Sequence, residues 1–405
     1  MNAPLRPALR SKEDVLRALV DEISIPPHMD EKARGRYRSI GDWLNRDAST
    51  LKFLDPRISA QGSFMLGTVI RPVGDRDAYD VDLVCRLAKA TMAMFTQAGL
   101  KAAVGVEIQS YVQAHNMASA PRDGRRCWTL DYADEASFHL DILPCLNAEQ
   151  QFRTRLSAAG IVESIGVSAD TAVGITDKNS PGYNVPGGAW NISNPTGYGR
   201  WFRLRQVLVL EPWRRAQMAA GRVFASVEDV PNHEVRTPLQ DTIKLLKRHR
   251  DGMFDGDEDR PISIIISTLA ARAYHGEATI AETLAAVLPA MAGLIETRGG
   301  QPWVSNPSYP LENFADKWPA APRKQELFMR WLAQANRDFG EYLRGSRFND
   351  IPAGLTKRLT ERTVGKVIPR LALTTPALAL VPAAAVQAET SRVIADGRAT
   401  KPWTP

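Results

Sequence analysis

The sequence predicts an α+β fold, with a small mixed sheet in the first half of the chain and a helical second half. Runs in which apolar residues recur at every second position predict strands over Asp80–Leu87, Arg126–Tyr132 and Phe138–Leu143. One helical segment around Val104–Asn116 separates the first strand from the other two. From Gly199 onward apolar residues recur with helical spacing, so this half of the chain is expected to supply helices.

Two helices are predicted before the strands. Ser11–Asp14 has the residues of a helix start and precedes apolar positions with helical spacing, and a second, polar helix is expected over Glu31–Leu51. The segment Ala169–Tyr198 is rich in Gly, Pro and Asn, which predicts a long ordered loop. The helices expected after this loop cover Trp201–Ala220, Pro238–Arg250, Ile262–His275, Ile280–Thr297 and Arg323–Leu343.

These patterns divide the chain into three parts. Residues 1–198 are expected to form a lobe that contains the sheet and the N-terminal helices, and residues 199–372 a helical lobe. Residues 373–405 are rich in Ala, Pro and Thr and have few apolar anchors, which predicts a flexible tail.

The composition excludes several classes of protein. Hydrophobic residues make up 44% and charged residues 24% of 405, which is typical of globular rather than disordered or fibrous chains. A net charge of +6 favours polyanionic partners such as nucleotides or nucleic acid, with a merely solvated basic surface as the alternative. The three scattered cysteines predict neither a disulfide framework nor a zinc site. Because no run resembles a membrane span or a signal peptide, a cytoplasmic protein without a membrane partner is expected.

Two aspartates on the first strand are the strongest candidates for a functional site. Side chains of a strand alternate between its faces, so Asp80 and Asp82 project from one side and their apolar neighbours from the other. Two like charges this close repel each other unless a cation lies between them. Mg²⁺ prefers oxygen ligands and needs one or two carboxylates in addition to substrate phosphates, so the pair predicts a magnesium site. The alternative is an ordinary solvent-facing strand surface.

The last predicted strand repeats this pattern. His139 and Asp141 lie on one face, and the apolar residues between them lie on the other. If this strand neighbours the first, Asp141 can share a pair of metal ions that activate an attacking hydroxyl and stabilise leaving pyrophosphate. Asp141 is then the candidate for a metal ligand or a base near the acceptor hydroxyl.

A glycine and a serine upstream are suited to phosphate binding. In Gln61-Gly62-Ser63, glycine allows close approach of the backbone, and a serine that opens a helix offers its hydroxyl and free N–H groups to an anion. The segment is not a P-loop, because no Gly-Lys-Ser/Thr follows it. An ordinary turn is the alternative reading of the pair taken alone. The order and spacing of Gly62-Ser63, Asp80-x-Asp82 and Asp141 make the combined pattern specific.

Several stretches of the sequence match a known family. They are Gln61–Val69, Tyr79–Val84, Ser193–Phe202 and Leu239–Asp251, together with the shorter Thr176–Lys178 and Glu312–Trp318. They resemble the nucleotidyltransferases of the polymerase-beta superfold, and among these the bacterial cGAS/DncV-like enzymes (CD-NTases). The resemblance extends from about residue 35 to residue 345. It implies a bilobed, OAS/cGAS-like fold in which residues 1–198 form the catalytic lobe and the helical lobe completes the nucleotide pocket.

The resemblance also implies roles for individual residues. Gln61, Gly62 and Ser63 would hold the donor triphosphate. Asp80 and Asp82 with Asp141 would bind two Mg²⁺ ions, for which Mn²⁺ is a possible substitute.

Further nucleotide contacts are expected from the helical lobe. Lys247 and Lys244 would reach the phosphates as flexible point charges, unless the run Lys244–Arg250 is a solvated helix face. Ser263 would contact a phosphate or a base, and Tyr198 is a candidate for stacking on a base.

The activity implied by the resemblance is synthesis of a cyclic oligonucleotide messenger. ATP and GTP would be joined into a cyclic dinucleotide such as cyclic GMP–AMP, which activates a downstream effector in antiphage defence. Activation by double-stranded DNA is not expected, because the scattered cysteines provide no zinc-binding insertion. The C-terminal tail is a possible handle for a protein partner, with a frayed end as the alternative.

Two other functions remain open at this point. One is a nucleotidyltransferase that adds nucleotides to RNA, to a protein or to a small molecule. The other is a catalytically inactive nucleotide- or RNA-binding protein, against which the three intact carboxylates argue.

Overall fold

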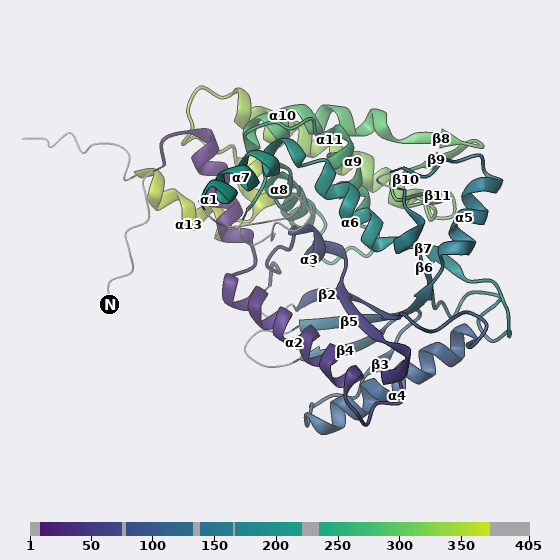
Figure 1. Ribbon diagram of the computed structural model, residues 1–405. Helices are drawn as coiled ribbons and strands as arrows, with labels where there is room; N and C mark the ends of the chain where they lie inside the picture. The colour runs from purple at the N-terminus through teal and green to yellow at the C-terminus, as the bar shows by residue number, and fades with distance from the viewer. Residues whose placement is uncertain (1–8, 75–77, 133–137, 165–166, 221–234, 373–405) are drawn as a thin grey trace, which may run out of the picture.

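The computed structural model describes residues 9–74, 78–132, 138–164, 167–220 and 235–372 (Figure 1). The prediction of a mixed α and β protein is confirmed, since a sheet in the first half is followed by a mainly helical second half. The predicted tail, residues 373–405, lies outside the described residues. In the part of the chain described, no helix is both long enough and apolar enough to cross a bilayer.

A mixed sheet carries the predicted strands. Among the described residues it has seven strands in the order β1-β2-β5-β4-β3, with β6 paired to β5 and β7 to β6. Its strands are Pro56–Ala60 (β1), Tyr79–Leu87 (β2), Arg122–Asp123 (β3), Trp128–Tyr132 (β4), Phe138–Asn147 (β5), Val173–Ile175 (β6) and Asn191–Ser193 (β7). The two central strands β2 and β5 are parallel, and the other pairs are antiparallel.

Helices occur in both halves of the described chain. The first half contains Lys12–Ile23 (α1), Pro27–Asn45 (α2), Gly62–Leu66 (α3), Gln97–Ala114 (α4), Glu149–Ala158 (α5) and Pro195–Leu204 (α6). The second half contains Val207–Ala219 (α7), Pro238–Met253 (α8), Ser263–Ala273 (α9), Ile280–Ala290 (α10), Pro322–Arg344 (α11), Ala353–Leu359 (α12) and Glu361–Ala372 (α13). Two short hairpins accompany them, formed by Glu296–Arg298 (β8) with Gln301–Trp303 (β9) and by Ser305–Asn306 (β10) with Tyr309–Asn313 (β11).

The structure differs from the sequence prediction where short elements meet. The predicted loop over Ala169–Tyr198 contains β6 and β7, and α6 begins within it because Asn194 caps the helix and Pro195 occupies its first position. The predicted helix over Trp201–Ala220 is two helices, α6 and α7. The hairpins β8–β9 and β10–β11 and the last two helices were not predicted, and the strands of the hairpins are too short to show a period.

Buried apolar residues form two main cores. One lies between the sheet and the helices α2 and α4, which cover the face that carries Val81, Leu83, Leu140 and Ile142 (Figure 1). The other is built from the helices of the second half, including α8, α9, α10 and α11. The opposite face of the sheet, which carries the aspartates, is not covered by α2 and α4.

Helix α1 belongs to the second core rather than to the sheet-containing part. Its buried residues, among them Leu16 and Leu19, pack with α8, α10 and α13. The predicted boundary after residue 198 therefore needs a correction, because it grouped α1 with the catalytic lobe. The periodicity of α1 shows that one of its faces is buried, but it carries no information on which core buries it.

Candidate functional site

The predicted carboxylates lie on one face of the central strands. Asp82 of β2 is directly opposite Asp141 of the parallel strand β5, and Asp80 is opposite His139. Strand β4 continues both rows, with Thr129 opposite Asp141 and Asp131 opposite His139. The polar face is thus a grid of two rows across three strands, which the alternation of each strand predicts.

The grid is held by hydrogen bonds between β4 and β5. The Thr129 hydroxyl donates to Asp141 with a separation of 2.5 Å between the oxygens. Nδ1 of His139 lies 2.5 Å from a carboxylate oxygen of Asp131. Asp131 itself accepts two hydrogen bonds from Arg122, of 3.0 and 2.8 Å. His139 and Asp141 of β5 therefore each have an orienting partner on β4.

Crowding of negative charge changes the acidity of the aspartates. Desolvation raises the pKa of Asp82 to about 6, and the charges of Asp141 and Asp80 contribute to the rise. Desolvation also raises the pKa of Asp80, which the charge of His139 opposes. Such a site favours a neutralising cation or proton.

A tight turn beside these strands carries the predicted phosphate-binding residues. Gln61 precedes α3, and its backbone N–H donates to the backbone carbonyl of Asp82 over 2.8 Å, which fixes the turn against β2. Gly62 has a φ of 57°, a conformation that other residues adopt at a cost. Ser63 follows in the first turn of α3 and faces the same pocket as Asp80 and Asp82.

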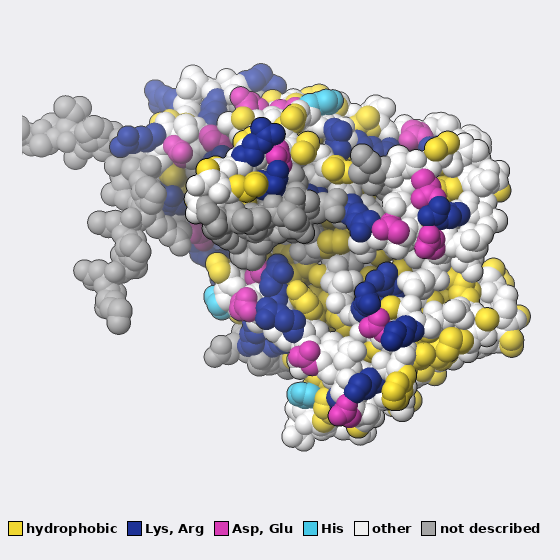
Figure 2. All heavy atoms as spheres, in the orientation of Figure 1, with side chains coloured by type: hydrophobic (Ala, Val, Ile, Leu, Met, Phe, Trp, Pro, Cys, Tyr) yellow, Lys and Arg dark blue, Asp and Glu magenta, His cyan; other side chains and the backbone are white. Residues whose placement is uncertain are grey.

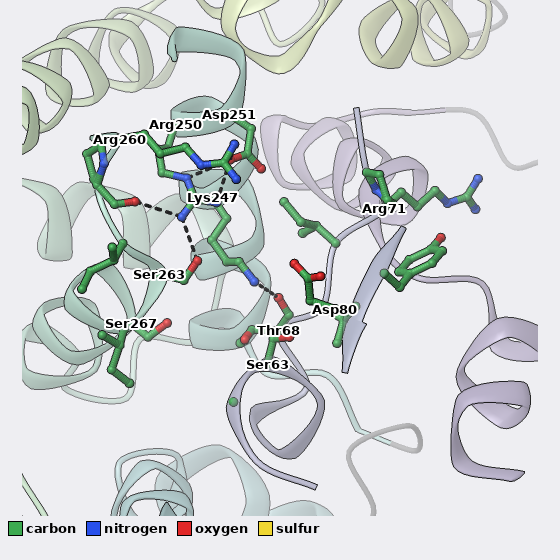
Figure 3. A pocket seen from close by; sticks show the side chains of 18 of the residues that line it. Ser63, Thr68, Arg71, Asp80, Lys247, Arg250, Asp251, Arg260, Ser263 and Ser267 are labelled. Carbon is green, nitrogen blue, oxygen red and sulfur yellow. Dashed lines mark hydrogen bonds and ion pairs between the residues drawn. The ribbon is translucent and has the colours of Figure 1, made fainter. Parts of the chain in front are cut away.

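Helix α8 closes the pocket from the helical half. Lys247 donates from Nζ to the backbone carbonyl of Thr68 over 2.8 Å, and Asp80 points from the opposite wall into the same space (Figure 3). The Lys247 side chain is buried and forms no ion pair with a described residue. Burial and the charge of Arg250 lower its pKa to about 7. An anion that enters the pocket would be the missing partner of this amine.

The start of α9 completes the pocket, which has a volume of about 620 Å³. Arg250 donates to the hydroxyl of Ser263 over 2.7 Å and forms an ion pair of 2.6 Å with Asp251 (Figure 3). Arg260 lies on the same wall, and Ser263 is the first residue of α9. Free N–H groups at the start of a helix and fixed guanidinium groups both favour anions.

The three carboxylates are neighbours, but they are not gathered around one point. Among the residues described, no three His, Cys, Asp or Glu side chains converge closely enough to hold a metal ion. The donor set itself, with carboxylate oxygens on adjacent strands, has the chemistry that Mg²⁺ prefers.

Comparison with known proteins finds a family model that matches one segment of the chain. Residues 56–144, which include Gly62, Ser63 and the three aspartates, match the family model described as the nucleotidyltransferase domain of cyclic GMP-AMP synthase DncV-like proteins. Residues 56–144 therefore resemble a DncV-like nucleotidyltransferase domain, called the DncV-like domain below.

Curated relatives extend the match beyond this domain. A c-di-GMP synthase of Roseivirga ehrenbergii is 26% identical over 336 residues, which cover 82% of this chain and 78% of that protein. The cyclic dinucleotide synthase CdnG of Bradyrhizobium diazoefficiens is 27% identical over 331 residues, which cover 78% of this chain and 73% of that protein.

Solved structures show the same fold. The CD-NTase CdnG of Bradyrhizobium diazoefficiens in complex with GTP aligns with a TM-score of 0.64 at 23% identity, covering 89% of this chain and 98% of that one. A dinucleotide cyclase, DncV of Vibrio cholerae, aligns with a TM-score of 0.52 at 13% identity, covering 85% and 94%. The similarity includes both the DncV-like domain and the helices that follow it.

Most of the predicted site residues meet in or beside this pocket, which is lined by residues of the DncV-like domain and of helices α8 and α9. Gly62, Ser63, Asp80, Asp82, Lys247 and Ser263 all line it. Asp141 adjoins Asp82 on the next strand, and Gln61 anchors the turn through its backbone.

Two predicted nucleotide contacts lie elsewhere. Tyr198 is buried in the helical core, and its hydroxyl lies 2.9 Å from that of Thr268, so its ring is not available to stack on a base. Lys244 is 3.3 Å from Asp241 and lines a second cavity, next to α1 and α2. The alternative of a solvated face for Lys244–Arg250 is also corrected, since the cations of this run are buried. The helical spacing of apolar residues in the sequence shows which face of a helix is buried, but not which cavity each side chain points to.

Several residues at the site of the DncV-like domain were not predicted. The wall opposite the carboxylates also contains Arg250, Asp251 and Arg260. The run of charged residues beside Lys247 was the one sequence feature that could have indicated them. Thr129 and Asp131 act as partners of the β5 side chains, and strand alternation in Arg126–Tyr132 was enough to put both on one face.

Substitution of Gly62 by Ala is expected to damage both stability and activity. A Cβ at this position would collide with a carboxylate oxygen of Asp82, and the backbone has a positive φ. We expect a loss of about 1–3 kcal/mol in the free energy of unfolding and a fall of at least about tenfold in activity. Thermal unfolding and nucleotide turnover measure the two effects.

Gly35→Ala is the matched control for this glycine. Gly35 lies within α2 and a Cβ there would meet no atom within 4 Å, so Ala should stabilise the helix slightly. Unchanged stability and activity of Gly62→Ala would contradict the close fit between the turn and Asp82.

Proposed function

We propose that the protein is a magnesium-dependent nucleotidyltransferase that joins nucleoside triphosphates into a cyclic dinucleotide. The observation that carries the proposal is the pocket in which Asp80 and Asp82 face Ser63 and the buried Lys247, which forms no ion pair with any described residue. Clustered carboxylates on one wall and buried cations on the other suit a substrate that brings both phosphates and a bound cation. The curated relatives, both named as cyclic dinucleotide synthases, support the same reaction class.

The residues of the pocket would bind the donor triphosphate and orient the acceptor hydroxyl. Ser63 and the N–H groups of its turn would hold the donor triphosphate, with Lys247 and Arg250 on the other side. An acceptor hydroxyl oxygen then bonds to the α-phosphorus of the donor. The bond from that phosphorus to the bridging oxygen breaks, and pyrophosphate leaves with the electron pair. Asp141, beside Asp82, would receive the hydrogen bond of the attacking hydroxyl, whose proton passes on to water.

Asp80, Asp82 and Asp141 would hold the magnesium. Their clustered carboxylate oxygens fit such an ion, and small side-chain rotations would close them on it. When bound, magnesium supplies charge neutralisation at the phosphates and a more acidic acceptor hydroxyl. This division assigns the carboxylates to the sheet-containing part and Lys247 to the helical part, which together would form one active site.

GTP is the nucleotide that the comparisons favour. One curated relative is named a c-di-GMP synthase, and the solved CdnG contains GTP. We therefore propose a guanine-containing product, either cyclic di-GMP or cyclic GMP–AMP. Such a product would act as a messenger that activates a downstream effector in antiphage defence. On the face drawn in Figure 2, Lys and Arg side chains are spread over both halves with acidic side chains among them, which gives a nucleic acid no continuous basic patch there.

Incubation with labelled GTP and ATP tests the proposal. With Mg²⁺ and no added acceptor, the protein should release pyrophosphate and form a phosphatase-resistant product, whose mass distinguishes cyclic di-GMP from cyclic GMP–AMP. Chelation of the metal by EDTA should stop the reaction, and Mg²⁺ or Mn²⁺ should restore it. Nucleotide transfer seen only with added RNA, protein or small molecule would instead support a transferase with a separate acceptor. No turnover under any of these conditions would leave a nucleotide-binding protein.

A further inference from the structure

A histidine beside the proposed metal site has no role in the reaction described so far. His139 is directly opposite Asp80 on one side and Asp131 on the other, two residues before Asp141 on the same strand face. Its side chain is 41% exposed, so a ligand on this face of the sheet can reach it. It is the basic member of a grid whose other charged members are carboxylates.

The ring of His139 has a defined orientation. Asp131 is fixed by two hydrogen bonds from Arg122, and a carboxylate accepts hydrogen bonds, so Nδ1 of His139 must donate to it. The other ring nitrogen, Nε2, has no partner among the described residues.

The spacing of His139 and Asp141 matches the two hydroxyls of a ribose. Residues two apart on one face of a strand are separated by roughly 6–7 Å along the strand. A vicinal diol that makes hydrogen bonds of roughly 2.7–2.8 Å at both ends bridges such a gap once the side chains lean together. A hydroxyl both donates and accepts, so it suits Nε2 in either protonation state of the ring.

We infer that His139 binds the non-attacking ribose hydroxyl of the acceptor nucleotide and thereby selects which hydroxyl attacks. This inference rests on the proposed function, because it assigns Asp141 to the attacking hydroxyl. Asp131 and Arg122 are positioning residues that hold the imidazole, and they do not contact the nucleotide. The choice between 2′–5′ and 3′–5′ linkage is then made at the His139 and Asp141 pair.

The linkage of the product tests the inference directly. The wild-type protein, His139→Ala and the control His115→Ala are incubated with GTP, ATP and Mg²⁺, and the products are digested with a nuclease that cuts 3′–5′ bonds alone. His115 is an exposed histidine at the end of α4. We expect His139→Ala to shift the linkage ratio by about tenfold, the effect of one hydrogen bond, and His115→Ala to leave it unchanged.

Substrate analogues separate a contact from a general loss of activity. Removing the non-attacking hydroxyl, with 2′-deoxy or 3′-deoxy GTP as the wild-type linkage dictates, should lower kcat/KM of the wild type by about tenfold. The same analogue should cost His139→Ala nothing further, because the two changes delete one interaction. Asp131→Asn should shift the linkage ratio in the same direction as His139→Ala, with unchanged thermal stability.

Several outcomes would overturn the inference. Equal linkage ratios in wild type and His139→Ala, or additive losses from the analogue and the variant, would show that Nε2 does not touch the acceptor. If His139→Ala lowers the unfolding temperature but leaves the linkage ratio unchanged, His139 has only a structural role in its ion pair with Asp131. If the wild type forms no nucleotide product at all, the proposed function fails. If it forms a product whose linkage does not depend on His139, only the inference about His139 fails.

Discussion

Replacement of Asp82 by Asn is expected to abolish nucleotidyl transfer and at the same time to stabilise the folded protein. The carboxylate would be needed to hold magnesium, so turnover should fall by about 10³-fold or more. In the metal-free protein, however, the same carboxylate is desolvated and faces Asp80 and Asp141. Asn keeps the shape of the side chain and removes the repulsion.

The sign of the stability effect follows from the pKa. The pKa of Asp82 is about 6 in the folded protein and near 3.8 in an unfolded chain, so the unfolded chain loses this proton more readily. Folded stability is then greatest below pH 3.8 with respect to this group and falls as the pH rises through about 6. At pH 7 and without metal, Asp82→Asn should gain about 1–3 kcal/mol in the free energy of unfolding.

Thermal unfolding with and without Mg²⁺ measures this prediction. Mg²⁺ should raise the unfolding temperature of the wild type and not that of Asp82→Asn. Asp47→Asn is the control, because Asp47 is almost fully exposed and pairs with Lys52 far from the grid. A destabilised but active Asp82→Asn would show that the metal site has been assigned to the wrong residues.

Replacement of Lys247 by Met should weaken binding of nucleoside triphosphates by about 10- to 100-fold, the range for a lost charge-assisted hydrogen bond. Burial holds the pKa of this amine at about 7, so at pH 8 the amine of the empty protein is mostly neutral. A triphosphate favours the charged form, so its binding should take up about one proton at pH 8. Calorimetry in buffers of different ionisation enthalpy measures the uptake.

The controls for Lys247 come from the same helix. Lys244→Met removes a second buried amine of α8, but Lys244 pairs with Asp241 and lines the other cavity, so proton uptake should persist. Wild-type stability should also increase with pH between about 7 and the usual lysine pKa near 10.5, since the unfolded chain holds the proton there. Lys247→Met should lose this increase. Uptake that survives in Lys247→Met would assign the titration to another group.

The parts of the site that strand alternation determines could be predicted from the sequence. Asp80, Asp82 and Asp141 share a face because each strand has a period of two, and the parallel pairing of β2 and β5 then puts Asp82 opposite Asp141. Sequence alone could not give the partner strands, so the hydrogen bonds that Thr129 donates to Asp141 and that Asp131 accepts from His139 were not predicted. Register depends on contacts between segments that are distant along the chain.

Helical periodicity was a weaker guide to the site. Lys244 and Lys247 differ by about 60° around the axis of α8, and this small rotation directs them to different cavities. Tyr198 has an aromatic ring of the kind that stacks on bases, but α6 directs this ring into the core, where its hydroxyl contacts Thr268. The pattern of a helix shows that a residue is enclosed, whereas the identity of the enclosing element depends on tertiary packing.

The position of α1 has a consequence for the order of folding during synthesis. Its apolar face is buried by α8, α10 and α13, so it leaves the ribosome more than 200 residues before its first partner, the sheet-forming segment being made in between. The sheet-containing part is in this sense an insertion within the helical part. The nascent chain must therefore carry an uncovered amphipathic helix while the sheet assembles, and the helical core can close when α8 emerges. Such long-range contacts slow folding and expose apolar surface to chaperones.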